Sequence, residues 1–367
     1  MKLIILLCVL MLISCRAELP SKPKVEIIIL NEYETIVEIE KHTLSAPSVL
    51  RYGNDSNLFV YDNSIGKVFE LDSNGNVVME YGRRGVGPGE FISVNNIFLT
   101  NDYIFIIDEL LLFIHKFDRN GKLFSTFDYG AIVSAGSAPP PPMSPGIQVN
   151  DINNQPFVTL TGNILLSSVK SEQNVNSIYE MINWEGNRLS NIGELPDGST
   201  FMFNPEEYRA AINNRITPAM YRPYAFPVQD LYSEDEIFLI YSAIPIIAKY
   251  DLYGNKLWEI EIEQTSEIEA IENHYFETME KLSRTSTMVL KKYSNGISSH
   301  DGDLFLISNT VPNDPLWIHH FNGKGELIRR YKMISEDNDL LPIVDIDSHN
   351  RLIFVVTEMS EIRAYPY

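Results

Sequence analysis

Two adjacent arginines, Arg83 and Arg84, are the residues whose type and spacing best suit ligand binding in this sequence. A guanidinium group presents its N–H donors in a planar fork that matches a carboxylate or a sulfate. Both arginines lie in the segment from Gly82 to Phe91, which also contains Glu90. We predict that Arg83, Arg84 and Glu90 contribute to a ligand site. The alternative is that the two arginines pair with carboxylates of the chain itself.

Metal chemistry has weaker support in the sequence. The seven histidines do not have the spacing of a metal site. His319 and His320 are neighbours in a predicted strand and face opposite sides of it, so they cannot bind the same ion. Asp345, Asp347 and Asn350 resemble part of a calcium loop, but the glycine and the distal glutamate of the twelve-residue site are missing. We therefore predict no metal and no cofactor.

The elements that position these residues are predicted from a repeated turn. A five-residue pattern occurs five times between apolar runs typical of β-strands. It consists of an apolar residue, Asp or Asn, two variable residues and Gly. The Asp or Asn side chain can accept a hydrogen bond from the backbone two residues on, and the glycine adopts the positive φ that the turn needs. The five copies start at Leu71, Phe117, Ile182, Tyr250 and Phe321.

Each turn belongs to a unit of four antiparallel strands. The strand before each turn is preceded by an unbroken apolar run, as in residues 58–61 and 104–107, which indicates a strand covered on both faces. A sixth unit after residue 343 lacks its outer strand, and residues 25–30 or 35–39 can supply it. We predict an all-β, six-bladed β-propeller over residues 25–367, closed by pairing of an N-terminal strand with the last blade. A pair of packed β-sheets is the alternative.

Longer spacing between the later turns predicts insertions. Residues 136–146 are rich in proline and should form an extended surface loop. Residues 204–212 begin with an asparagine cap, a proline and two glutamates, which together start a helix. Residues 266–282 place apolar side chains at three- and four-residue steps and also predict a helix. We expect both helices to pack outside the ring.

The segment Gly82 to Phe91 carries a more specific resemblance. With the residues before it, the sequence Gly-Arg-Arg-Gly-Val-Gly-Pro-Gly-Glu-Phe is similar to the linker of NHL-type repeats. Together with the N-terminal features described next, the chain resembles bacterial six-bladed, TolB-like propeller lipoproteins. The resemblance implies the fold much more strongly than an activity. It also implies that this linker lies at the mouth of a central channel.

The N-terminus predicts export. Residues 1–14 contain Lys2, a short apolar run and Ser14, as in a signal peptide. Residues 12–15 resemble the lipobox of bacterial lipoproteins, which implies cleavage before Cys15 and acylation of this cysteine. A plain secretory signal is the alternative. Residues 15–24 are predicted to form a tether, and Arg16 favours the outer membrane over inner-membrane retention.

The formal net charge of −20 argues against a nucleic-acid partner, because the protein repels phosphates at long range. No nucleophile elbow or phosphate-binding loop is present. We expect a lipid-anchored cell-envelope propeller that binds a protein or glycan partner, or serves as a scaffold. The alternative is a hydrolase or lyase that acts on a polysaccharide or lactone. A channel mouth with aromatic and Arg side chains favours binding, whereas several His and carboxylates around a metal favour catalysis.

Overall fold

The computed structural model describes residues 25–38, 44–53, 56–135, 155–167, 177–200, 204–282, 288–312, 314–333, 340–347, 351–356 and 361–367. The predicted signal peptide (1–14), the tether (15–24) with Cys15, and the proline-rich segment 136–146 lie outside these ranges. None of the helices in the described ranges has both the length and the apolar character that a membrane span requires.

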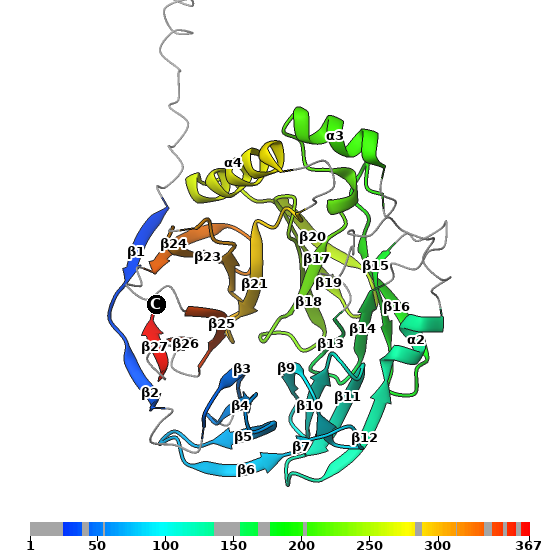
Figure 1. The fold of residues 1–367 in the computed structure, drawn as a ribbon, viewed down its shortest axis with the longest axis vertical. Helices are drawn as coiled ribbons and strands as arrows, with labels where there is room; N and C mark the ends of the chain where they lie inside the picture. Colours follow the sequence, from blue (N-terminus) through cyan, green and yellow to red (C-terminus); the bar gives the residue numbers. More distant parts are fainter. Residues whose placement is uncertain are drawn as a thin grey trace, which may run out of the picture.

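Six β-sheets are arranged in a ring (Figure 1). The first two sheets contain strands β3 (Pro47–Tyr52), β4 (Leu58–Asp62), β5 (Lys67–Leu71) and β6 (Val77–Tyr81), and β9 (Val94–Leu99), β10 (Tyr103–Asp108), β11 (Phe113–Asp118) and β12 (Leu123–Asp128). The third and fourth contain β13 (Phe157–Val158), β14 (Ile164–Ser167), β15 (Ser177–Ile182) and β16 (Arg188–Glu194), and β17 (Ala225–Gln229), β18 (Glu236–Tyr241), β19 (Ile246–Asp251) and β20 (Lys256–Glu261). The last two contain β21 (Tyr293–Ser298), β22 (Leu304–Ser308), β23 (Leu316–Phe321) and β24 (Leu327–Met333), and β25 (Leu340–Ile346), β26 (Arg351–Val356) and β27 (Glu361–Pro366). The prediction of a six-bladed β-propeller is confirmed.

The five repeated turns have the predicted chemistry. In the first, Asp72 Oδ1 accepts hydrogen bonds from the backbone N–H groups of Asn74 and Asn76, both at 2.9 Å. Gly75 has a φ of 79°, which favours glycine. The same pair of bonds, to the residues two and four positions on, occurs at Asp118, Asn183, Asp251 and Asn322. Each hairpin is therefore specified by a local sequence signal.

The ring closes through an N-terminal strand, as predicted. Strand β2 (Glu34–Glu38) pairs antiparallel with β27, and Val37 lies opposite Ile362. The other candidate segment forms β1 (Glu26–Leu30), which pairs in parallel with β24 and adds a fifth strand to blade five. The N-terminal segment thus covers the outer edges of two neighbouring blades, which leaves fewer unpaired strand edges.

The hydrophobic core lies between neighbouring blades. Strand β4 is buried at every position, which explains its unbroken apolar run. Phe59 and Tyr61 of blade one pack in one cluster with Ile97 and Ile106 of blade two. Each blade is therefore covered on both faces by its neighbours, and the ring behaves as one packed unit.

Two predicted helices are confirmed, and one further helix follows the second blade. Helix α3 (Pro205–Asn213) is capped by Asn204, whose side chain accepts from the N–H groups of Glu206 and Glu207. Helix α4 (Ser266–Lys281) joins blades four and five. Both lie together on one side of the ring (Figure 1). Among the described residues, the helical elements that the sequence analysis did not predict are α2 (Tyr129–Ala135) and the short 3-10 helix η2 (Ala219–Tyr221).

Candidate functional site in the central channel

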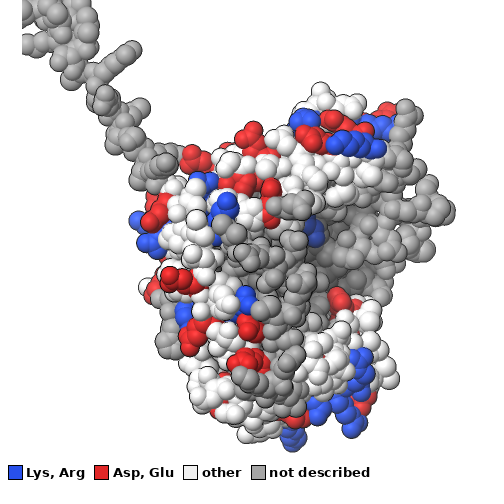
Figure 2. Space-filling model, turned by 60° about the vertical axis from the view of Figure 1, so that its left-hand side comes forward, with Lys and Arg blue, Asp and Glu red and all other residues white. Residues whose placement is uncertain are grey.

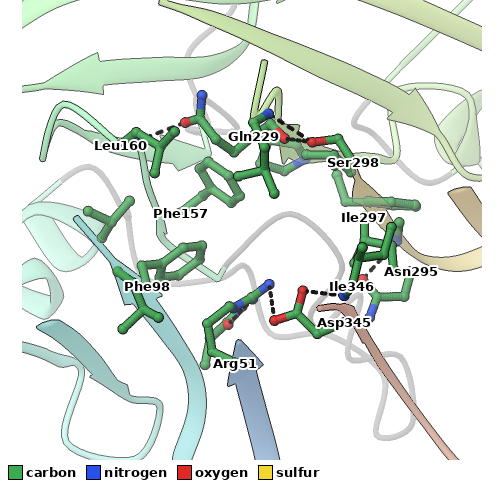
Figure 3. Close-up of a pocket in the computed structure, with 18 of the residues that line it drawn as sticks. Arg51, Phe98, Phe157, Leu160, Gln229, Asn295, Ile297, Ser298, Asp345 and Ile346 are labelled. Carbon is green, nitrogen blue, oxygen red and sulfur yellow. Dashed lines mark hydrogen bonds and ion pairs between the residues drawn. The ribbon is translucent and has the colours of Figure 1, made fainter. Parts of the chain in front are cut away.

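A cavity of about 410 Å³ occupies the central channel, and the innermost strands of all six blades line it. These strands are β3, β9, β13, β17, β21 and β25, each the first strand of its blade. Figure 3 shows the arrangement of the side chains around this space. The volume lies within the range of small-molecule binding pockets, roughly 300–1,000 Å³.

One wall of the cavity is apolar. Phe98 of β9 and Phe157 of β13 contact each other edge to face, with 4.8 Å between the ring centroids and an interplanar angle of 72°. Leu160 and Phe226 extend this wall. Such ring surfaces suit a ligand with a flat apolar face.

Arg51 of β3 lies beside this apolar wall. Its Nε donates to the Ile97 carbonyl and its Nη2 donates to Asn96 Oδ1, both at 3.0 Å. These two bonds fix the plane of the guanidinium group next to β9, 5.7 Å from the Phe98 ring centroid. The side chain keeps 29 % of its surface exposed. Arg51 is therefore a charged group with a fixed orientation that solvent can still reach.

Asp345 of β25 lies beside Arg51 in the cavity wall (Figure 3), with 3.7 Å between Oδ2 and Nη1 of Arg51. Its two oxygens accept from the backbone N–H groups of Tyr52, at 2.6 Å, and Ile346, at 2.9 Å. Burial raises the pKa of Asp345 above its ordinary value, although Arg51 and the two N–H groups act in the opposite direction. The carboxylate thus joins blade six to blade one at the point where the ring closes.

Uncharged polar groups line the opposite side of the cavity and connect its strands by hydrogen bonds. Ser298 of β21 donates to the Gln229 carbonyl at 2.6 Å and accepts from the Leu231 N–H at 2.9 Å. Gln229 Oε1 accepts from the Leu160 N–H at 3.0 Å, which connects blade four to blade three. Side chains with no net charge therefore link three neighbouring blades around the channel.

The charge of the cavity differs in sign from that of the whole protein. The charged residues among the described lining residues are the cations Arg51, Arg119 and Lys291 and the acids Glu234 and Asp345. The chain as a whole has a net charge of −20. On the outer face drawn in Figure 2, acidic and basic side chains occur among each other without one continuous basic surface. The described residues that line the cavity thus include three cations and two acids.

The predicted site residues lie elsewhere. Arg83 Nη2 forms an ion pair with Glu90 Oε1 at 2.7 Å, within the parallel pair of β7 (Arg83–Arg84) and β8 (Glu90–Phe91). Arg84 donates to the Asn63 carbonyl. The N–H of Gly87 and the Arg83 side chain lower the pKa of Glu90. The structure therefore brings the three residues of the linker together and pairs them with one another or with the backbone.

The linker from Gly82 to Phe91 lies apart from the cavity. None of Arg83, Arg84 and Glu90 lines the cavity. Arg84 contacts the turn between β4 and β5, whereas the cavity includes Gly53 at the turn between β3 and β4. Because β4 is antiparallel to both neighbours, the two turns lie at opposite ends of the blade. A role of the linker residues in ligand binding stays a prediction.

No group of three or more His, Cys, Asp or Glu side chains is arranged to hold a metal ion in the described ranges. The two aspartates of the calcium-like segment are separately engaged. Asp347 pairs with Arg351, with 2.7 Å between Oδ2 and Nε, whereas Asp345 faces Arg51. Asn350 lies outside the described residues.

A second polar cluster is buried beneath helix α4. Glu267 Oε1 lies 2.6 Å from His319 Nε2, and Arg330 Nη1 donates to Glu267 Oε2 at 3.1 Å. His319 Nδ1 lies 2.8 Å from the hydroxyl group of Tyr293. Burial acts to raise the pKa of Glu267, but the hydrogen bond and charge of His319 outweigh it and hold the pKa at about 2. His320 points the other way, toward Asp303, as predicted for neighbours in a strand.

Sequence reasoning missed Arg51, and it considered Asp345 only as part of a calcium-like segment, not as a residue of the channel. Their signal is weak: each is a single charged residue in the apolar first strand of its blade. A general rule could have identified them, because the first strand of a propeller blade lines the channel. To apply that rule, the first strand of each blade must be identified from the sequence. The polar residues of these strands are then the candidates for a site in the channel.

Comparison with known proteins supports the fold. A family model described as "6-bladed beta-propeller" matches residues 38–133, which include blades one and two. A Bacteroides fragilis protein described as exported is similar in structure, with a TM-score of 0.54 and 11 % identity, over 92 % of this chain and 98 % of that one. The chain is a six-bladed propeller. At this identity, the likeness extends to the fold alone.

Two further solved structures are similar at lower scores. Virginiamycin B lyase from Staphylococcus aureus has a TM-score of 0.44 and 12 % identity, over 92 % of this chain and 88 % of that one. The calcium-binding protein regucalcin from Agrobacterium tumefaciens has a TM-score of 0.44 and 8 % identity, over 93 % of this chain and 95 % of that one. No curated protein matches the sequence.

Proposed function

We propose that this protein is an exported binding module of the cell envelope, and that its central cavity binds part of a glycan or protein partner. The observation that carries the proposal is the composition of the cavity wall. Aromatic rings, Phe98 and Phe157, lie beside the guanidinium group of Arg51. An aromatic surface next to one oriented charge is typical of a site that recognises a ligand.

The architecture supports this role. Six innermost strands line the cavity, and buried contacts between blades hold them in place. A binding site on a closed, packed ring loses little conformational entropy when a ligand enters, because its walls are already ordered. The channel thus offers a preformed site that needs no folding step.

The test is direct binding to the folded protein. We would record saturation-transfer NMR spectra with a panel of glycan fragments and short peptides. Asn295→Trp places a large side chain in the cavity wall and should abolish binding, whereas Val78→Trp, at an exposed position of β6, should not. A panel in which no ligand distinguishes the two variants contradicts the proposal. Turnover of a fragment into products supports the enzymatic alternative instead.

Anchoring is a separate part of the proposal. We propose that Cys15 carries the lipid and that residues 15–24 tether the propeller to the membrane. The lipobox-like sequence of residues 12–15 supports this proposal. Stable membrane attachment takes at least two acyl chains, which lipoprotein acylation supplies. Cys15→Ser should abolish labelling by radioactive palmitate and release the protein from membranes. Cys8→Ser, a matched change within the signal peptide, should leave both unchanged. A Cys15→Ser protein that still sediments with membranes contradicts lipid anchoring.

A further inference from the structure

We propose that the ligand of the central cavity is an acidic sugar, bound through its carboxylate by Arg51 and through the apolar face of its ring by Phe98 and Phe157. This inference rests on the proposed function, namely that the cavity binds a ligand. It adds the chemical class of that ligand and names the residue that anchors it.

The first argument is the state of the Arg51 guanidinium group. Two of its five N–H donors are used by Ile97 and Asn96, and these bonds orient the plane. Nη1 lies 3.7 Å from Asp345, which is longer than a hydrogen bond. Arg51 therefore keeps donors for a second carboxylate without losing the bonds that hold it. A planar fork of this kind binds a carboxylate through two parallel hydrogen bonds.

The second argument concerns Asp345. Its oxygens already accept from the backbone N–H groups of Tyr52 and Ile346. The carboxylate is therefore stabilised independently of a close contact with Arg51, and a ligand does not have to displace it. The other charged residues that line the cavity are the cations Arg119 and Lys291 and the acid Glu234, so their net charge is positive and favours an anion further.

The third argument is the position of the aromatic wall. The Arg51 guanidinium carbon is 5.7 Å from the Phe98 ring centroid, and Phe98 contacts Phe157. A sugar acid carries its carboxylate directly on a ring whose C–H groups form a flat apolar face. One sugar unit can thus contact the charge and the rings together. A carboxylate on a flexible aliphatic side chain, as in a peptide, lacks such a face.

The experiment compares acids with matched neutral ligands. We would titrate the protein with galacturonate, glucuronate and N-acetylneuraminate, and with the methyl ester of each, by isothermal titration calorimetry. A hydrogen-bonded contact with a charged group contributes about 1.5–3 kcal/mol, or roughly 10- to 150-fold in affinity. At least one acid should therefore bind at least tenfold more tightly than its ester.

Variants of Arg51 locate the effect. Arg51→Met should reduce the affinity for the acid to that for the ester and leave the ester unchanged. Arg51→Lys keeps the charge but loses the fork, so an intermediate loss is expected. Arg209→Met removes an exposed arginine of helix α3 and serves as the matched control. Should Arg51→Met fail to fold, Arg51→Lys and the acid–ester pairs decide the question.

The outcomes separate this inference from the proposed function. Equal binding of acids and esters, without any effect of Arg51 variants, overturns the acidic-sugar assignment and leaves a cavity that binds ligands. Tighter, Arg51-dependent binding of N-acetylaspartate or N-acetylphenylalanine overturns the sugar in favour of a peptide carboxylate. Failure of every sugar and peptide to bind the wild-type cavity overturns both proposals.

Discussion

Replacing Glu267 by Gln should weaken the attachment of helix α4 to blade five. Glu267 is only 7 % exposed and accepts hydrogen bonds from both His319 and Arg330. Gln keeps nearly the same shape but has no charge, and its amide group presents N–H donors to His319 or Arg330. The substitution therefore tests the ion pair without opening a cavity.

The expected magnitude follows from the pKa. The carboxyl group of Glu267 has a pKa of about 2 in the folded protein, compared with an ordinary value of 4.5. One pKa unit corresponds to about 1.4 kcal/mol, so the ionised form contributes about 3 kcal/mol to folding. Loss of one partner of a buried ion pair typically destabilises a protein by about 3–5 kcal/mol, because the remaining charge is unpaired. We expect a loss of about 3 kcal/mol.

The assay is urea unfolding, followed by tryptophan fluorescence, at pH values from 7 to 3. The folded pKa is depressed, so the contribution of Glu267 is fully present above pH 4.5 and is lost as the pH falls toward 2. The difference between the wild type and Glu267→Gln should therefore be largest at pH 7 and shrink below pH 4.5. Its sign should not reverse within this range.

Glu269→Gln is the matched control, because Glu269 lies in the same first turn of α4 but is exposed. Both substitutions remove one charge near the helix N-terminus, an effect of about 0.3–1 kcal/mol. Only Glu267 contacts His319 and Arg330. Equal stability of the two variants at pH 7, or a difference that does not depend on pH, would refute the reasoning.

Two further predictions concern ring closure and the linker. Val37 is 1 % exposed, so Val37→Asp buries an unpaired carboxylate in the strand that closes the ring. Its free energy of unfolding in urea should fall by several kcal/mol, and size-exclusion chromatography should show aggregates. Val78→Asp, at an exposed position, should keep a free energy of unfolding within about 0.5 kcal/mol of the wild type. A monomeric Val37→Asp protein of normal stability would show that β2 is not needed for closure. Gly82→Ala should lower the free energy of unfolding by about 2–5 kcal/mol, because φ is 62° and the new Cβ would clash with the Phe91 ring. Gly186→Ala is the control: φ is 82°, but no atom beyond its neighbours in the chain lies within 4 Å of the new Cβ, so only about 1–2 kcal/mol should be lost. Similar losses for the two alanine variants would contradict the close contact.

The turns and helix starts of this protein are specified by short patterns of neighbouring residues. The Asp72 and Gly75 pattern specifies a hairpin because all of its hydrogen bonds join residues within four positions. Asn204 similarly caps a helix through the N–H groups that follow it directly. The number of such units, together with an incomplete last unit, was enough to predict six blades and closure by an N-terminal segment. Only the strand pairing in the structure shows which of the two candidate segments supplies the outer strand of blade six, namely Glu34–Glu38.

The candidate site, in contrast, depends on contacts between residues that are far apart in the sequence. Tyr52 donates to Asp345 across 293 positions of sequence, and this contact exists only because the ring brings blade six beside blade one. The adjacent arginines of the linker gave a clear local signal, yet the fold places them at the far end of the blade, where Arg83 pairs with Glu90. Turns and caps depend on neighbours along the chain, so a sequence displays them. A channel depends on which strand of each sheet lies innermost and on the order of the sheets around the ring, and those are long-range contacts that a single sequence does not encode in any local pattern.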